Sequence, residues 1–181
     1  MLILWKIVEK CVILWEELFL QSFNTHMTSF LGEYEVAIDA KGRFLLPSGF
    51  RKQLAEGMGE KFVINRGFEN CLSIYTMDVW SAISEKINRL NDFKPAVREF
   101  KRLFLNGATI VEADSADRIL LPKPLQDHAG IKKDAVLSAQ GNKVELWDKD
   151  TYYNYLRERV GGFSKLAEDV ANDFGNPFEN L

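Results

Sequence analysis

Two arginine residues, Arg43 and Arg118, occupy matched positions in a motif that occurs twice in the chain. Residues 39–47 read Asp-Ala-Lys-Gly-Arg-Phe-Leu-Leu-Pro, and residues 114–122 read Asp-Ser-Ala-Asp-Arg-Ile-Leu-Leu-Pro. A guanidinium group is a planar fork of donors that binds a phosphate, or the O6 and N7 atoms of guanine, through two hydrogen bonds. The repeated arginine therefore indicates a site for an anion or a nucleic acid.

The same motif also has a purely structural interpretation. Asp39 and Asp114 precede the arginines by four residues, across turns that end at Gly42 and Asp117. Aspartate at the first position of a turn bonds to the backbone ahead of it, and glycine or aspartate tolerates a left-handed conformation. Each Asp–Arg pair could then be a surface ion pair worth about 0–1 kcal/mol. The spacing alone favours neither interpretation.

The residues around the two arginines differ in charge but share an apolar end. Lys41 is replaced by Ala116 in the second copy, where Asp117 adds a negative charge, so the second turn is expected to attract phosphate less well. Both copies continue with a leucine pair and a proline. We predict that Leu45–Leu46 and Leu120–Leu121 belong to the core and that the proline ends each strand.

No pattern typical of an enzyme or a metal site is present. The sequence contains no glycine-rich phosphate loop, no nucleophile motif and no cysteine–histidine cluster. We therefore predict neither catalytic activity nor a cofactor. Cys11 and Cys71 lie in apolar runs, are expected to be buried, and suit a reducing compartment. His26 and His128 lack partners at the spacing of metal ligands.

The composition is ordinary for a globular protein. The 181 residues are 46% hydrophobic and 27% charged, with a net charge of −3, and suffice for one domain or two small fused halves. Such a charge excludes a globally basic nucleic-acid binder, so a DNA site must be local or created by assembly. Arg98, Lys101 and Arg102 could contact phosphate, although a solvated helix face is the favoured interpretation.

The elements around the motif are predicted to follow the same order twice. In each half a strand, the turn and a return strand predict a hairpin, followed by a short helix, two strands and a longer helix. The strands are expected at 34–38, 43–46, 61–64 and 71–75, and again at 109–113, 118–121, 135–137 and 143–147; the helices at 48–56, from Thr76, at 95–105 between the halves, after Asp148 or Asp150, and at 165–174. Two such units are too small to bury both faces alone and predict one pseudo-twofold, mainly β barrel.

The first 26 residues are strongly apolar but carry five charged side chains. The uncharged stretches are too short for a membrane span, and a basic start and a cleavage site are absent, so no secretory signal is predicted. The segment fits an amphipathic helix that packs on another surface. Alternatively, Met27 is the natural start and residues 1–26 are not translated.

Both motifs, together with Gly141-Asn-Lys-Val-Glu-Leu-Trp-Asp148, resemble the bacterial MraZ family from about residue 30 to about residue 161. The resemblance implies an α+β, mainly β fold: an AbrB-like double-split β-barrel built from two tandem half-repeats with peripheral helices. The expected parts are the apolar extension 1–26, a first repeat 30–92, a bridging helix 93–107, a second repeat 108–160 and a helical tail 161–181.

The resemblance also implies a function. Members are transcriptional regulators, and this chain is expected to act as a repressor that binds direct repeats in double-stranded DNA upstream of the division and cell-wall gene cluster. A ring-shaped homo-oligomer would present Arg43 and Arg118, with Lys41 as a phosphate contact, in the cytoplasm on the nucleoid and without a membrane partner. The residues that shape the turns are Asp39, Gly42, Asp114 and Asp117. The alternative is a protein-interaction ring or an antitoxin-like partner binder with the arginine hairpins at subunit contacts.

Overall fold

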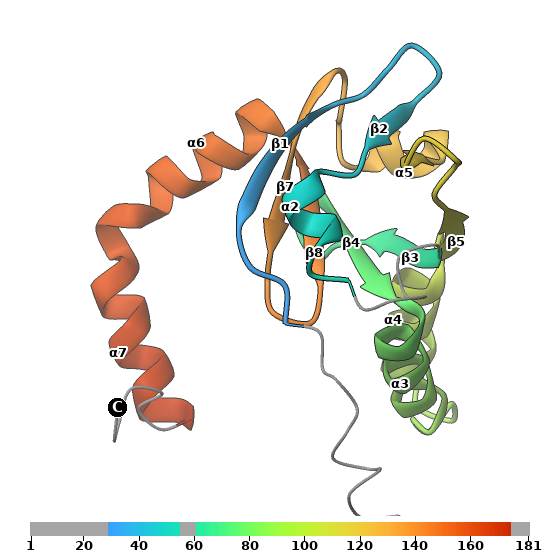
Figure 1. Cartoon of the computed structure of the whole chain (residues 1–181). Helices are drawn as coiled ribbons and strands as arrows, with labels where there is room; N and C mark the ends of the chain where they lie inside the picture. The colour runs from blue at the N-terminus through green and yellow to red at the C-terminus, as the bar shows by residue number, and fades with distance from the viewer. Residues whose placement is uncertain (1–28, 55–60, 175–181) are drawn as a thin grey trace, which may run out of the picture.

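The computed structural model describes residues 29–54 and 61–174, so the predicted segment 1–26, with Cys11 and His26, lies outside the described residues. Six strands form an antiparallel sheet in the order β1-β7-β8-β4-β3-β5, and two more form a separate ladder, β2-β6 (Figure 1). The strands are β1 Glu33–Ala37, β2 Arg43–Leu45, β3 Lys61–Arg66, β4 Cys71–Thr76, β5 Thr109–Glu112, β6 Arg118–Leu120, β7 Asp134–Ala139 and β8 Val144–Asp148. The predicted fold class, α+β and mainly β, is confirmed.

The two halves of the chain are interleaved. β1 pairs with β7, and β5 pairs with β3, so each half contributes its first strand to the other half. β2 pairs with its equivalent β6, and β4 pairs with its equivalent β8. The register is symmetric as well, because Phe44 lies opposite its counterpart Ile119. Each half therefore depends on the other for the pairing of its first two strands.

Two hairpins were predicted, 34–38 with 43–46 and 109–113 with 118–121. Their turns form, but the prediction that the two strands of each hairpin pair with each other is wrong. The first turn closes, since the backbone N–H of Asp39 donates to the carbonyl of Arg43 over 2.8 Å. The flanking strands then part, β1 toward β7 and β2 toward β6. A hairpin confined to one half would bury apolar side chains of that half only, whereas exchange lets both halves cover one core.

A single main core lies between the six-stranded sheet and the β2–β6 ladder. Phe44 and Ile119 enter it from the ladder and are 1% and 0% exposed. Leu72 and Leu146 enter it from the middle of the large sheet and are both fully buried. Burying each such side chain contributes about 1.5–3 kcal/mol, so the ladder is anchored firmly by its inward face.

Helices surround the sheets on several sides (Figure 1). They are α2 Ser48–Arg51, α3 Met77–Asn88, α4 Pro95–Leu105, α5 Lys123–His128, α6 Lys149–Arg159 and α7 Phe163–Phe174, with a 3-10 turn η1 at Val160–Gly162. Of the two predicted caps, Asp148 rather than Asp150 caps α6, because its side chain accepts a hydrogen bond of 3.2 Å from the backbone of Thr151. α2 is shorter than the predicted helix 48–56. Within the described residues no helix combines the length and the apolar character that crossing a bilayer requires.

The bridging helix α4 packs against α3 through aromatic and basic side chains. Trp80 of α3 stacks on Phe104 of α4, with ring centroids 6.0 Å apart. The predicted solvated position is wrong for Lys101. Its ammonium group contacts the Asp92 carboxylate at 2.6 Å, and only 14% of its side chain is exposed. Arg98 likewise donates to the carbonyl of Asp92 over 2.7 Å. Lys101 also donates to the carbonyls of Asn88 and Leu90 at the C-terminal end of α3, where a cation is favourable.

Candidate functional site

Asp39 organises the first turn with both of its carboxylate oxygens. Its Oδ1 accepts hydrogen bonds from the backbone N–H groups of Lys41 (2.8 Å) and Arg43 (2.9 Å). Its Oδ2 accepts from Nε (2.9 Å) and Nη2 (2.7 Å) of Arg43. Gly42 has a φ of +78°, the left-handed conformation for which glycine is suited. The turn and the guanidinium group are thus held together as one unit.

The second turn repeats this arrangement. Asp114 Oδ1 accepts from the backbone N–H groups of Ala116 (2.9 Å) and Arg118 (3.0 Å), and Oδ2 accepts from Arg118 Nε over 2.9 Å. Asp117 has a φ of +60°, the only positive φ of a non-glycine residue in the part of the chain that the structure describes. The predicted left-handed conformation of Asp117 is therefore confirmed. Arg51 of α2 forms an ion pair with this carboxylate, a contact that the sequence did not reveal.

Backbone hydrogen bonds tie the two turns to each other. Leu46 donates to the carbonyl of Asp117 over 2.9 Å, and Leu121 donates to the carbonyl of Gly42 over 2.8 Å. Arg43 Nη1 also lies 3.8 Å from Asp114 Oδ2. Arg43 and Arg118 therefore do not occupy two separate sites. With their aspartates they form one cluster of alternating charge on the β2–β6 ladder.

The outward face of this ladder carries Arg43, Leu45, Arg118 and Leu120, which we call the ladder face. The prediction that Leu45 and Leu120 belong to the core is wrong, since they are 57% and 56% exposed. Leu46 and Leu121, the second residue of each pair, are buried as predicted. Neighbouring strand residues point to opposite sides, so the burial of Phe44 forces Leu45 outward. Strict alternation of inward and outward side chains over residues 43–46 and 118–121 would have predicted that Leu45 and Leu120 are exposed.

The geometry reconciles the structural and the binding interpretations of the motif. A guanidinium group has five N–H donors, and in Arg43 the Nε–H and one Nη2–H bond to Asp39. The other donors of Arg43 remain for a ligand, and its side chain is 24% exposed, against 38% for Arg118. The ion pair with Asp39 orients the guanidinium group of Arg43 and occupies only some of its donors. Lys41 is exposed at the tip of the first turn.

Lowered pKa values accompany the two Asp–Arg pairs. Hydrogen bonds from Arg43 lower the pKa of Asp39 from 3.8 to about 2, and hydrogen bonds from Arg118 do the same for Asp114. In return, the hydrogen bond to Asp114 raises the pKa of Arg118, and the charges of Asp114 and Asp39 add to this effect. Asp39, Asp114 and Arg118 are thus charged at any physiological pH.

We expect Asp39 and Asp114 to titrate near pH 2 in the folded protein, as measured by carbon-detected NMR of their carboxylates. Because the folded-state pKa is lowered, the pairs stabilise the fold above about pH 4 and lose this contribution as the pH falls toward 2. Arg118→Ala should raise the pKa of Asp114 and leave Asp39 low. Wild-type titration of both carboxylates near pH 4 would contradict the geometry of the pairs.

A second cluster of ligand-type atoms lies where the β3–β4 connection meets β8. Glu69, Cys71 and Glu145 each offer one atom, and these atoms lie within 4.8 Å of one another. Burial raises the pKa of the Cys71 thiol to about 12, and Lys143 Nζ donates to Glu145 over 2.7 Å. A protonated thiol and a carboxylate already neutralised by lysine bind a metal ion poorly. The cluster gives no reason to assign a metal here.

Comparison with known proteins agrees with the resemblance. Residues 29–103 and 104–173 match the family described as "MraZ protein, putative antitoxin-like". Proteins named "Transcriptional regulator MraZ" from Christiangramia forsetii and Flavobacterium psychrophilum are 45% and 41% identical over 145 residues, covering 80% of this chain and 94% and 92% of those proteins. The protein of that name from Natranaerobius thermophilus is 38% identical over 143 residues, covering 79% of this chain and 97% of that protein.

Among solved structures, the solution structure of PHS018 from Pyrococcus horikoshii is similar at 18% identity and a TM-score of 0.29. The similarity covers 64% of this chain and 86% of that one. It is too weak to bear on the fold.

Proposed function

This chain belongs to the MraZ family, and from that premise we propose that it is a transcriptional regulator that binds double-stranded DNA. The observation that carries the proposal is the ladder face, on which Arg43 and Arg118 occupy pseudo-twofold positions with donors still available. The relatives are named as transcriptional regulators, a non-enzymatic class, in line with the predicted lack of catalytic activity.

The ladder face has a size and chemistry suited to the major groove. That groove admits a two-stranded β-ribbon, and β2 and β6 form a ribbon of three residue pairs. The two arginines can each bind a phosphate or a guanine edge, and the exposed Leu45 and Leu120 can contact thymine methyl groups. Lys41 at the tip of the first turn would add a phosphate contact.

A single copy is expected to bind weakly. In the ladder region the positive charges of Lys41, Arg43, Arg51 and Arg118 are largely offset by three aspartates, Asp39, Asp114 and Asp117. Few phosphates are therefore neutralised per copy, and affinity has to come from several linked copies. We accordingly propose a ring-shaped homo-oligomer that binds direct repeats.

The genomic target rests on the family resemblance. We propose that the repeats lie upstream of the division and cell-wall gene cluster and that the protein represses transcription there. Such a regulator acts in the cytoplasm on the nucleoid.

A second candidate is a protein-interaction ring or an antitoxin-like partner binder. Two observations favour it: the family description includes the words "antitoxin-like", and both arginines already have carboxylate partners. In this case the arginine turns would lie at subunit or partner contacts. Arg43→Ala would then dissociate the assembly, whereas the DNA-binding proposal leaves its mass unchanged.

Footprinting on the DNA upstream of this gene tests the main proposal. We expect protection of evenly spaced repeats at about 50 mM salt, and a steep loss of affinity with rising salt because several phosphates are contacted. A fragment of equal length with scrambled repeats is the matched control. Equal protection of both fragments would argue against sequence-specific binding, and absence of protection on both would argue against DNA binding.

A further inference from the structure

The two ends of the β2–β6 ladder differ, although the ladder itself is pseudo-twofold. α5 lies against the first turn, where a Cβ atom added to Gly42 would be 3.8 Å from Oε1 of Gln126. Arg51 of α2 is the equivalent of Gln126, since each is the fourth residue after the proline of its motif, and it pairs with Asp117 of the second turn. The matched position is therefore neutral at the first end, whereas at the second end it is a cation already paired with the turn.

Gln126 helps to fix the segment that carries Lys132 and Lys133. Its side chain donates to the carbonyl of Ile131 over 2.9 Å, and the backbone N–H of Ile131 donates to the carbonyl of Gln126 over 3.1 Å. On the other side, the backbone N–H of Ile38 donates to the carbonyl of Lys133 over 2.7 Å. The two lysines are therefore held between α5 and the strand that leads into the first turn.

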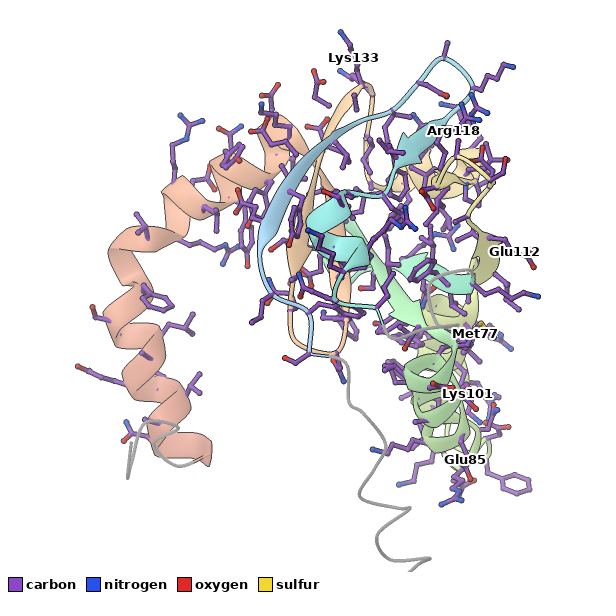
Figure 2. The ribbon with its side chains drawn as sticks, in the orientation of Figure 1. Met77, Glu85, Lys101, Glu112, Arg118 and Lys133 are labelled. Atoms are coloured by element: carbon purple, nitrogen blue, oxygen red, sulfur yellow. The ribbon has the colours of Figure 1, made fainter. Side chains whose placement is uncertain are left out.

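The side chains of Lys132 and Lys133 are exposed and form no ion pair within the part of the chain that the structure describes. The acidic residue that follows, Asp134, points to the opposite face of β7, because neighbouring strand residues alternate. Figure 2 shows Lys133 at the same end of the molecule as Arg118. Together with Lys41, the two lysines gather positive charge beside the first turn.

These two lysines have no counterpart in the first half. They directly precede β7, which corresponds to β3, and the two residues that precede β3 in the sequence are Gly59 and Glu60. The second turn also has Ala116 where the first turn has a lysine. The sequence thus adds positive charge beside the first turn and not beside the second.

We propose that Lys132 and Lys133 bind phosphate groups of the DNA backbone that passes the first end of the ladder. A lysine binds phosphate as a point charge, which an exposed side chain on a fixed segment can supply. The proposal rests on the DNA binding proposed above and extends its site beyond the ladder face. It adds two phosphate contacts to the few that the ladder region offers to each copy.

The same lysines give each copy a direction on the DNA. A ladder with two equal ends would bind a repeat and its reverse complement equally well, because a twofold rotation exchanges the two strands of the ladder. Phosphate contacts set the orientation of a protein on the duplex. With extra contacts at one end only, one of the two orientations is preferred, as recognition of direct repeats requires.

Replacing both lysines by glutamine tests the contact, because glutamine keeps a long polar side chain and removes the charge. At about 50 mM salt, Lys132→Gln/Lys133→Gln should bind the upstream DNA at least about tenfold more weakly than wild type. Its affinity should also depend less on salt, with a log–log slope shallower by about two for each repeat contacted. Lys132→Arg/Lys133→Arg should keep the wild-type affinity and slope. In hydroxyl-radical footprints the glutamine variant should lose protection at one edge of each repeat, the same edge throughout.

Lys86→Gln/Lys94→Gln is the matched control, because it removes two exposed lysine charges on the α3–α4 side of the molecule. It should bind as wild type does, and both double variants should unfold at the wild-type urea concentration. Binding by Lys132→Gln/Lys133→Gln that equals this control, or protection lost equally at both edges of a repeat, would overturn the proposal and leave the DNA-binding proposal standing. A wild-type chain that protects no DNA would overturn both.

Discussion

Replacing Arg43 and Arg118 together by alanine is expected to abolish the gel shift of the upstream DNA, with affinity reduced at least about 30-fold. Each bidentate contact contributes about 1–3 kcal/mol, and 1.4 kcal/mol corresponds to a factor of ten. The fold should tolerate the change, because both side chains lie in partly exposed ion pairs, and such pairs contribute about 1 kcal/mol or less each. Electrophoretic mobility shift and native mass spectrometry on the same samples measure the two effects.

Arg89→Ala is the matched control for this experiment. Arg89 pairs only with Glu85 among the described residues, and Glu85 lies at the end of the molecule opposite Arg118 (Figure 2). The variant loses a positive charge but should keep the gel shift. Arg43→Lys should fall between wild type and Arg43→Ala, since lysine keeps the charge and loses the fork. A double alanine variant that still shifts DNA as Arg89→Ala does would refute the proposed contact.

Replacing Phe44 by alanine is expected to lower the free energy of unfolding by about 3–5 kcal/mol. Phe44 is 1% exposed and lies opposite Ile119 in a ladder of only three residue pairs. Truncation leaves a cavity under the ladder face and removes an anchor of both halves at once. Urea denaturation followed by circular dichroism measures the loss. DNA affinity should fall as well, because the strand that carries Arg43 loses its support.

Leu45→Ala, one residue further along the strand, is the control for Phe44→Ala. Leu45 is 57% exposed, so its truncation should change the stability by no more than about 0.5 kcal/mol. The same variant should weaken DNA binding if Leu45 contacts a thymine methyl group. Equal destabilisation by the two variants would contradict the inward and outward assignment of these side chains.

Local chemistry was sufficient to predict much of the candidate site from the sequence. The turn between Asp39 and Arg43 depends on hydrogen bonds between residues no more than four apart, and the same pattern identified the second turn. The left-handed conformation of Asp117 followed from its alignment with Gly42. The order of strands and helices followed from periodicity, because a side chain's position in the period decides which face it occupies.

The pairing partners of the strands could not be predicted from the sequence. β1 and β2 continue from a closed turn, yet they pair with β7 and β6 of the other half. Nothing local distinguishes that arrangement from a simple hairpin, since backbone hydrogen bonds are available to any neighbouring strand. The exchange is decided by which side chains can share one core, and those side chains lie far apart in the sequence. For the same reason, only the tertiary structure brought Arg43 within 3.8 Å of Asp114 and joined two turns into one charged cluster.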